Sequence, residues 1–293
     1  MIDLPFISKG KVRDIYDAGD GRLLMVTSNR ISAFDVVLDE PIKDKGKVLT
    51  AMTVKWLELL KSIASNHMIS HNMSEIENVL DGISLRSYKG QVMLVKKAEM
   101  LPIECIVRGY VSGSAWKEYQ KEGTIHAQKV RSNMLESEKL DEPIFTPSTK
   151  ADNGHDENIS VNEARNLVGN EILDKAIKIC LDSYTLAEEL ARSRGIIVAD
   201  TKFELGIVNG ELIICDEVLT PDSSRFWDLA LYKVGTTPPS FDKQPVRDYL
   251  ESIDWNKMPP PPKLPQEVVE ATSQRYVEAF ERIFQQSLEE WEC

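Results

Sequence analysis

The nine residues VADTKFELG, 198–206, constrain this chain most, because charged and apolar side chains alternate along them. Such alternation is typical of a β-strand, in which successive side chains point to opposite faces. Asp200, Lys202 and Glu204 would therefore share one face. Burying these charges together is costly unless they bind a cation and an anion, such as Mg²⁺ and a polyphosphate. Taken alone, the commoner explanation is a solvent-exposed strand with alternating charges.

A β-hairpin is predicted next, because the tight-turn pair Asn209-Gly210 leads into the apolar run ELIICDEV. A two-residue turn would place Glu204 opposite Cys215, with Asp216 on the other face. A three-residue turn, or an equivalent bulge, would place Glu204 directly opposite Asp216. We predict the second register, because two facing carboxylates make sense when they share a metal ion.

Composition and charge exclude several classes of protein. The chain has 293 residues, of which 42% are hydrophobic and 28% charged, as in an ordinary globular protein. Its net charge of −12 argues against nucleic acid as a partner. No apolar run is long enough to span a membrane, and the first residues contain no apolar signal region, so we expect a cytoplasmic location. The four cysteines are widely spaced, and we expect them to be reduced.

The distribution of patterns along the chain predicts an α+β fold with two lobes. A hairpin over 11–28, a helix over 46–62 and a strand from residue 91 suggest a β-rich lobe, residues 1–97. The remainder, 98–293, would form a larger lobe.

The larger lobe is expected to contain two long helices. Ser160 and Glu163 form a capping-box pattern ahead of a helix that we expect to continue to about Arg194. After Pro265, a final amphipathic helix would pack on the body of the protein.

A basic cluster lies near the N-terminus, in SKGKVRDIYD. Gly10 would allow the backbone to approach a phosphate, and Lys9, Lys11 and Arg13 would neutralise it. The pattern is not a Walker P-loop, and it is closer in logic to the hairpin that covers ATP in kinases. By itself it is equally consistent with a solvated basic strand.

Two further clusters are suited to binding phosphate or carboxylate groups. Arg108 ends an apolar strand, and Ser114 follows at the expected start of a helix, where backbone N–H groups favour anions. In LTPDSSRFWD, residues 219–228, Asp222, Ser224 and Arg225 form a polar turn that we expect to precede an aromatic helix. An ordinary helix cap explains each cluster equally well when it is considered alone.

The polar stretch FTPSTKADNGHDENIS reads as a loop. Thr149 and Lys150 would meet an anionic substrate, whereas acids such as Asp156 would meet an amine. His155, the one histidine in this stretch, does not make a zinc site.

These clusters, taken in order, resemble the SAICAR synthetases (phosphoribosylaminoimidazole-succinocarboxamide synthases) of purine biosynthesis. LPIECIVRGYVSGS and VADTKFELG are similar to the two signatures of that family. GKVRDIYD, FTPSTK, GHDENIS and DEVLTPDSSRFWD also match in order, and the resemblance is weakest after about residue 235. Leu205 stands where the family signature has phenylalanine, and we expect this to alter packing without changing the chemistry.

The resemblance implies a fold with an ATP cleft between the two lobes, and an ADP-forming carbon–nitrogen ligase. ATP, L-aspartate and carboxyaminoimidazole ribonucleotide (CAIR) would give SAICAR, ADP and phosphate, with Mg²⁺ required. Phosphoryl transfer to the CAIR carboxylate would form an acyl phosphate, which the aspartate amine attacks. The longer connection at 117–160 resembles the longer form of the family, and on this ground we expect a monomer.

The resemblance also implies roles for individual residues. ATP would be bound by Lys9, Gly10, Lys11, Val12, Arg13, Lys97, Met100, Glu204 and Asp216. Glu204 and Asp216 would hold Mg²⁺, and Lys202, Lys11 and Asp200 would be catalytic. CAIR would be bound by Arg108, Ser114, Asp222, Ser224 and Arg225, and aspartate by Thr149, Lys150 and Asp156.

Two alternatives stay open from the residues themselves. A kinase-like phosphotransferase would use a similar two-lobed ATP site, although no HRD or DFG motif is present. A non-catalytic nucleotide-binding module would bind ATP, but it would not need the additional anion-binding clusters around Arg108 and Arg225.

Overall fold

The computed structural model describes residues 2–34, 36–150 and 157–291, and the chain folds as two compact units. Unit 1 consists of Met1–Lys55, His67–Lys97 and Phe241–Cys293, and unit 2 of Trp56–Asn66 and Ala98–Ser240. This division differs from a single boundary after residue 97, because residues 56–66 belong with unit 2 and the C-terminal segment belongs with unit 1. The expected ATP cleft between the lobes stays a prediction.

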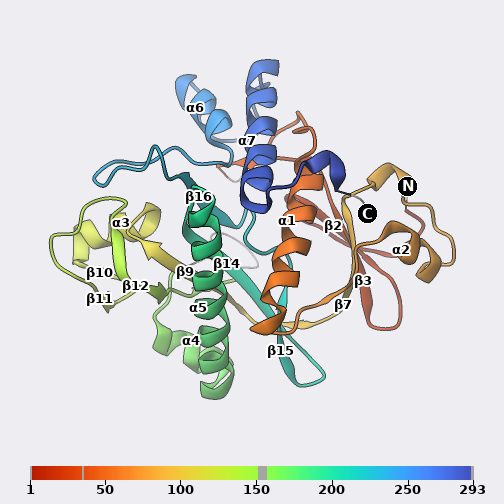
Figure 1. Ribbon diagram of the computed structural model, residues 1–293, viewed down its shortest axis with the longest axis horizontal. Helices are drawn as coiled ribbons and strands as arrows, with labels where there is room; N and C mark the ends of the chain where they lie inside the picture. The colour runs from red at the N-terminus through yellow and green to blue at the C-terminus, as the bar shows by residue number, and fades with distance from the viewer. Residues whose placement is uncertain (1, 35, 151–156, 292–293) are drawn as a thin grey trace. The chain divides into compact units, whose positions relative to one another are not determined.

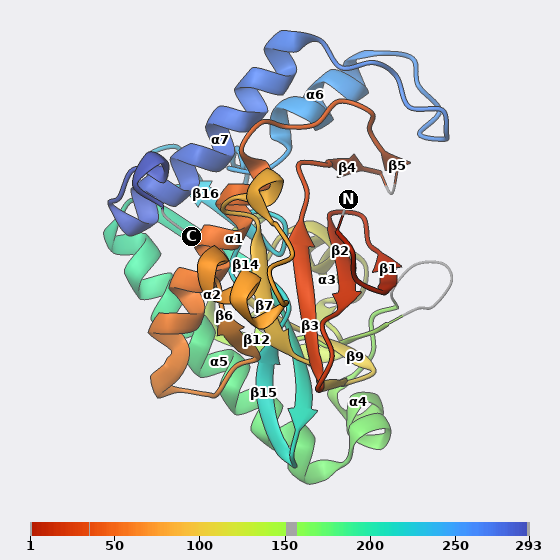
Figure 2. The same ribbon diagram turned by 90° about the vertical axis from the view of Figure 1, so that its right-hand side faces the viewer.

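Unit 1 is built around a five-stranded antiparallel sheet with the strand order β1-β2-β3-β7-β6 (Figures 1 and 2). The expected hairpin is present as β2 and β3, which pair from Arg13↔Thr27 to Asp17↔Leu23. The elements of unit 1 are β1 (Phe6–Lys9), β2 (Arg13–Asp17), β3 (Arg22–Thr27), β4 (Ser32–Ala33), β5 (Val36–Val37), α1 (Lys45–Leu59, whose last four residues belong to unit 2), β6 (Met68–Ser70), α2 (Met73–Val79), η2 (Arg86–Tyr88), β7 (Val92–Lys96), α6 (Gln244–Ser252), α7 (Gln266–Phe284) and η3 (Leu288–Glu290).

The C-terminal helices join unit 1 because they complete one of its apolar cores. Ile31 and Ile42, from the irregular segment around β4 and β5, pack with Val246 of α6, Leu250 of α6 and Leu264. Helices α6 and α7 lie side by side (Figure 2). An amphipathic pattern identifies the apolar face of such a helix but not the segment that covers it, and this is why the expected boundary differs from the division into units.

Unit 2 is built around a seven-stranded sheet whose longest strand, β14, runs from Ile196 to Val208 (Figure 1). Strand β14 pairs with β8, β9, β15 and β16, so it lies at the centre of the sheet. The other elements of unit 2 are η1 (Leu60–Ser62), β8 (Glu99–Met100), β9 (Ile103–Tyr110), α3 (Gly113–Glu122), β10 (Thr124–Ile125), β11 (Gln128–Lys129), β12 (Lys139–Phe145), β13 (Ser148–Thr149), α4 (Val161–Val168), α5 (Asn170–Ser193), β15 (Glu211–Cys215) and β16 (Ser224–Asp228).

Helix α5 covers the apolar face of this sheet and packs on β9 and β14 (Figure 1). The Tyr184 hydroxyl donates a 2.7 Å hydrogen bond to the carbonyl oxygen of Val198. A Cβ atom at Gly109 would lie 1.9 Å from the same hydroxyl, so only glycine fits beneath it. Leu205 is fully buried, as expected for the apolar face of β14.

Two expected elements are different in the structure. The long helix expected from Ser160 is two helices, because Gly169 adopts φ 85° between α4 and α5. The predicted capping box of Ser160 and Glu163 is confirmed. The segment after Asp222 is the strand β16 rather than a helix start, since it pairs with β14.

Among the residues that the structure describes, no helix is both long and apolar enough to cross a membrane. Cys105, Cys180 and Cys215 are buried and form no disulfide, whereas Cys293 lies outside the described residues.

We expect Gly109→Ala to lower the free energy of unfolding by about 1–3 kcal/mol, because the added methyl group overpacks the interface with Tyr184. Urea unfolding of the wild type, the two single variants and the double variant Gly109→Ala/Tyr184→Phe measures the coupling. The alanine should cost less in the Tyr184→Phe background, since the closest atom is then gone. Equal costs in both backgrounds would contradict the contact.

Candidate active site on the charged face of unit 2

Charged side chains gather on one face of the unit 2 sheet, opposite α5. On β14 this face carries Asp200, Lys202 and Glu204, and β9 aligns Arg108 with Asp200. Lys202 contacts both Glu104 of β9 and Glu204, which confirms the predicted shared face. Thr146, Ser148 and Lys150, from the segment that follows β12, contact the same residues. We call these eight residues the charged face.

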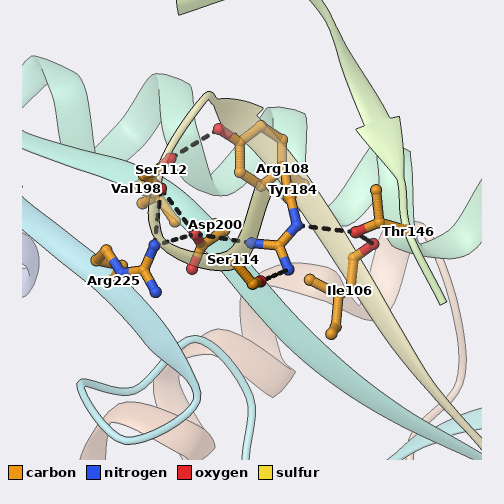
Figure 3. A network of polar contacts seen from close by, with 9 residues as sticks. All are labelled: Ile106, Arg108, Ser112, Ser114, Thr146, Tyr184, Val198, Asp200 and Arg225. Atoms are coloured by element: carbon orange, nitrogen blue, oxygen red, sulfur yellow. Dashed lines mark hydrogen bonds and ion pairs between the residues drawn. The ribbon is translucent and has the colours of Figure 1, made fainter. Parts of the chain in front are cut away.

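The buried end of the charged face is organised around one carboxylate oxygen (Figure 3). Oδ2 of Asp200 accepts hydrogen bonds from Arg108 Nη1 at 3.4 Å, Arg225 Nη1 at 2.9 Å and Ser112 Oγ at 3.1 Å. Arg225 Nη1 also donates to Ser112 Oγ at 2.7 Å, and Arg108 Nη2 donates to Ser114 Oγ at 3.3 Å. We call these five residues the arginine cluster. The structure thus brings Arg108, Ser114, Asp200 and Arg225 together, as their proposed roles require.

The arginine cluster carries an excess of positive charge. Two guanidinium groups share a single carboxylate, and the Arg108 side chain is only 6% exposed. Burial lowers the pKa of Arg108, Asp200 raises it and Arg225 lowers it again. A buried guanidinium group beside a partly exposed one, with a single counter-ion between them, suits a phosphate or carboxylate group.

Gly113 at the start of α3 permits this arrangement. It adopts φ 58°, and a Cβ atom there would lie 2.6 Å from Nη1 of Arg225. Both the backbone conformation and the close guanidinium therefore require glycine.

Further along β14, Lys202 is held between two carboxylates. Its Nζ lies 2.5 Å from Glu104 Oε1 and 3.5 Å from Glu204 Oε1, and Lys150 Nζ binds Glu204 Oε2 at 2.7 Å. Burial lowers the pKa of Lys202, but Glu104 and Glu204 outweigh it, so the pKa is raised above its ordinary value. Lys202 therefore remains an ammonium ion.

The predicted hairpin register is wrong. Glu204 pairs with Cys215, because Asn209 and Gly210 adopt φ 51° and 80° and form a two-residue turn. Asp216 follows the end of β15 and adopts φ 56°, so strand alternation does not fix the direction of its side chain. Burial raises the pKa of the Cys215 thiol to about 12, with further contributions from Asp216 and Glu204.

Two residues expected to bind CAIR, Ser224 and Asp222, lie outside the arginine cluster. The Ser224 hydroxyl lies 2.8 Å from Thr201 Oγ1 on the apolar side of the sheet, so it is not part of the arginine cluster. Asp222 lies in the turn before β16, where its backbone N–H donates to Thr220 Oγ1. Asp156 lies outside the described residues. Thr149 accepts a hydrogen bond from the backbone N–H of Glu157 at 3.2 Å.

The basic loop of unit 1 connects β1 to β2. Its ends are joined by the N–H of Gly10, which donates to the carbonyl of Arg13 at 2.7 Å, with Lys11 and Val12 between them. Of the other residues expected to bind ATP, Lys97 in unit 1 donates its backbone N–H to the carbonyl oxygen of Gly21, and Met100 in unit 2 lies in β8 and is 39% exposed.

Residues of the charged face that sequence analysis missed had a detectable signal. Glu104 is an acid within an apolar strand, four residues before Arg108 and therefore on the same face. Thr146 and Ser148 alternate in the same way within FTPSTK, together with Lys150, which the sequence had already indicated.

Among the described residues, no group of three or more His, Cys, Asp or Glu side chains is arranged to hold a metal ion. A metal ion held by Glu204 and Asp216 would therefore have two carboxylates as protein ligands, and substrate or water would supply the others.

We expect Asp200→Asn to lower the free energy of unfolding by about 3–5 kcal/mol, because it leaves the buried Arg108 without its counter-ion. Asp174→Asn is the matched control, since Asp174 pairs with Arg165 but is 64% exposed, and this variant should cost less than about 1 kcal/mol. Urea unfolding measures both changes, and similar small losses would contradict the importance of the shared carboxylate.

The comparisons with known proteins agree on one family. The sequence pattern of the SAICAR synthetases matches residues 6–262. The phosphoribosylaminoimidazole-succinocarboxamide synthase of Elusimicrobium minutum is 51% identical over 288 residues, which cover 97% of this chain and 97% of that protein. The corresponding synthase of Maridesulfovibrio salexigens is 50% identical over 98% of this chain and 96% of that protein.

Solved structures give the same result. The SAICAR synthase of Saccharomyces cerevisiae in complex with SAICAR has a TM-score of 0.90 and 42% identity, covering 97% of this chain and 96% of that chain. A SAICAR synthetase in complex with ADP has a TM-score of 0.70 and 25% identity, covering 96% and 98%. This chain therefore belongs to the SAICAR synthetase family.

Proposed function

We propose that this protein joins L-aspartate to the carboxylate of CAIR with hydrolysis of ATP, giving SAICAR, ADP and phosphate in purine biosynthesis. Support comes from the family, from the yeast relative bound to SAICAR and from the relative bound to ADP. The observation that carries the proposal is the arginine cluster, because its two guanidinium groups share the single counter-ion Asp200. ATP alone does not need such a receptor, whereas CAIR brings a phosphate and a carboxylate.

We assign Arg108, Ser114 and Arg225 to the CAIR site. Asp222, which lies in the turn just before β16, is the remaining candidate for this site. Asp200 keeps both guanidinium groups in place while it leaves some of their donors for the substrate. Ser224 is not included, because its hydroxyl faces the other side of the sheet.

The reaction requires an anionic phosphoryl group to reach an anionic carboxylate. A carboxylate is a poor electrophile, since its leaving group would be oxide. Phosphorylation converts it into an acyl phosphate, and the aspartate amine then attacks the acyl carbon and displaces phosphate. Cationic groups must offset the repulsion between the two anions. Lys202 supplies a permanent positive charge on the charged face, because its carboxylate partners raise its pKa. Lys11 and Asp200 complete the proposed catalytic set, Asp200 by holding the arginines.

ATP binding is assigned to the loop from Lys9 to Arg13, through its phosphates, and to the backbone around Lys97 and Met100, through adenine. Gly10 keeps the loop narrow, since a Cβ atom there would lie 3.1 Å from the Arg13 carbonyl oxygen. This assignment rests on the basic residues of the loop and on the family.

The residues present fit a magnesium ion. Glu204 and Asp216 offer the carboxylate oxygens that Mg²⁺ prefers, and Glu204 pairs across the hairpin with Cys215, the residue directly before Asp216. When bound, the ion would neutralise charge on the ATP phosphates. Glu204 contacts two ammonium groups, those of Lys150 and Lys202, which hold its carboxylate in place.

The aspartate site is assigned to Lys150 and Thr149. Lys150 presents an ammonium group on the charged face, which suits a substrate carboxylate. A cytoplasmic location and a monomeric state stay predictions.

Release of ADP by the purified protein tests the function. We expect it to require ATP, CAIR and aspartate together, with SAICAR formed in equal amount. Release with ATP alone, or with another acceptor, would favour an ATPase or kinase. Nucleotide binding without any release would favour a regulatory module.

Arg225→Ala is expected to raise the KM for CAIR by about tenfold or more, as for the loss of a charged hydrogen bond, with a much smaller effect on the KM for ATP. Arg165→Ala on α4 is the matched control, because Arg165 pairs with Asp174 away from the charged face. Steady-state kinetics with each substrate varied in turn measures these values. An equal rise for CAIR and ATP would count against the placement.

Asp216→Asn is expected to abolish Mg²⁺-dependent turnover while the melting temperature stays close to that of the wild type, because a metal ligand is lost without a core change. Asp248→Asn on the exposed surface of α6 should leave the Mg²⁺ requirement unchanged. A magnesium titration of activity checks both variants. Wild-type dependence on Mg²⁺ in Asp216→Asn would remove this residue from the metal site.

A further inference from the structure

The basic loop between β1 and β2 is held from one side by Arg30. Its Nε donates to the carbonyl oxygen of Lys11 at 3.3 Å, and Nη2 donates to that of Gly10 at 3.2 Å. The same guanidinium group binds both carboxylate oxygens of Asp14, at 2.7 and 3.1 Å. Arg30 comes from the segment after β3, so a residue distant in sequence fixes the loop.

Ser28 engages the next carbonyl of the loop. Its Oγ and its backbone N–H both donate to the carbonyl oxygen of Val12, at 2.5 and 2.8 Å. The carbonyl oxygens of Gly10, Lys11 and Val12 are therefore all bound by Ser28 or Arg30. Carbonyl oxygens repel a phosphate. Because these three accept hydrogen bonds from Ser28 and Arg30, they repel an anion that approaches the loop less strongly.

The contacts of Arg30 distinguish positioning from direct binding. An arginine has five N–H donors, and four of them are used by Gly10, Lys11 and Asp14. The positive charge is also matched by the Asp14 carboxylate, whose side chain is 22% exposed. Arg30 thus has little left to offer a phosphate, but it determines the shape of the loop that carries Lys11.

We propose that Arg30 is a positioning residue for polyphosphate, which sets the backbone of the loop from Gly10 to Val12 so that this loop accepts the ATP phosphates. The inference rests on the proposed function, and it adds a residue that the sequence did not indicate. Only an arginine serves here, because a planar fork can span two carbonyls and a carboxylate at once, whereas an ammonium group is a single point of charge.

The test compares Arg30→Lys with the matched control Arg22→Lys. Arg22 is the first residue of β3, which pairs with β2 in the unit 1 sheet. It makes contacts similar to those of Arg30, donating from Nε to the Gly19 carbonyl at 3.2 Å and from Nη2 to Asp20 at 2.7 Å. It holds the turn before β3 rather than the basic loop. Both variants keep the positive charge, so a difference between them reports on the position of the contact.

Titration calorimetry with ATP and with adenosine gives the readout. We expect Arg30→Lys to weaken ATP binding by about tenfold, as for lost charge-assisted hydrogen bonds, while adenosine binding changes less than about twofold. Arg22→Lys should change neither. In kinetics, the KM for ATP should rise while those for CAIR and aspartate stay constant. Ser28→Ala should act in the same direction, which provides a second test if Arg30→Lys folds poorly.

Equal weakening of ATP and adenosine, or unchanged ATP binding in both Arg30→Lys and Ser28→Ala, would overturn the inference. These outcomes are distinct from a failure of the proposed function, in which the wild-type protein itself would form no SAICAR. A wild-type enzyme that makes SAICAR and an Arg30→Lys variant with normal ATP affinity would leave the function standing and remove the role of Arg30.

Discussion

The site of unit 2 depends on a single carboxylate oxygen. Oδ2 of Asp200 binds Arg108, Arg225 and Ser112 at once, and it thereby allows a buried and a partly exposed guanidinium group to lie together. With no carboxylate between them the guanidinium groups would repel each other, and with a second one they would be neutralised. One carboxylate between two guanidinium groups therefore keeps the arginines in position and leaves a net positive charge, which would suit an anionic substrate.

Sequence patterns revealed the charged face because a strand has a period of two residues. Asp200, Lys202 and Glu204 could be assigned to one face without knowing any partner. The hairpin register was missed for a different reason. Asn209-Gly210 is itself the signal of a two-residue turn, and both residues adopt the positive φ that this turn needs. We preferred the longer turn because it would let two carboxylates share a metal ion. The structure has the two-residue turn that Asn209-Gly210 indicates.

Other features were beyond reach because they depend on which segments meet. Glu104 becomes a partner of Lys202 only when β9 pairs with β14, and Arg30 meets the basic loop only when β2 and β3 bring them together. The same holds for the division of the chain. Helices α6 and α7 show an apolar face in the sequence, but only packing reveals that Ile31 and Ile42 cover it. A single sequence contains the periodicities of its elements but not the pairing between distant ones.

Unit 1 is assembled from segments at both ends of the chain, and this affects how it folds during synthesis on the ribosome. Unit 2 is complete once residue 240 has emerged, whereas the apolar surface around Ile31 and Ile42 stays without its cover until the last fifty or so residues follow. The part of the protein made first is therefore among the last to finish folding. During translation it exposes an apolar surface that a chaperone would recognise.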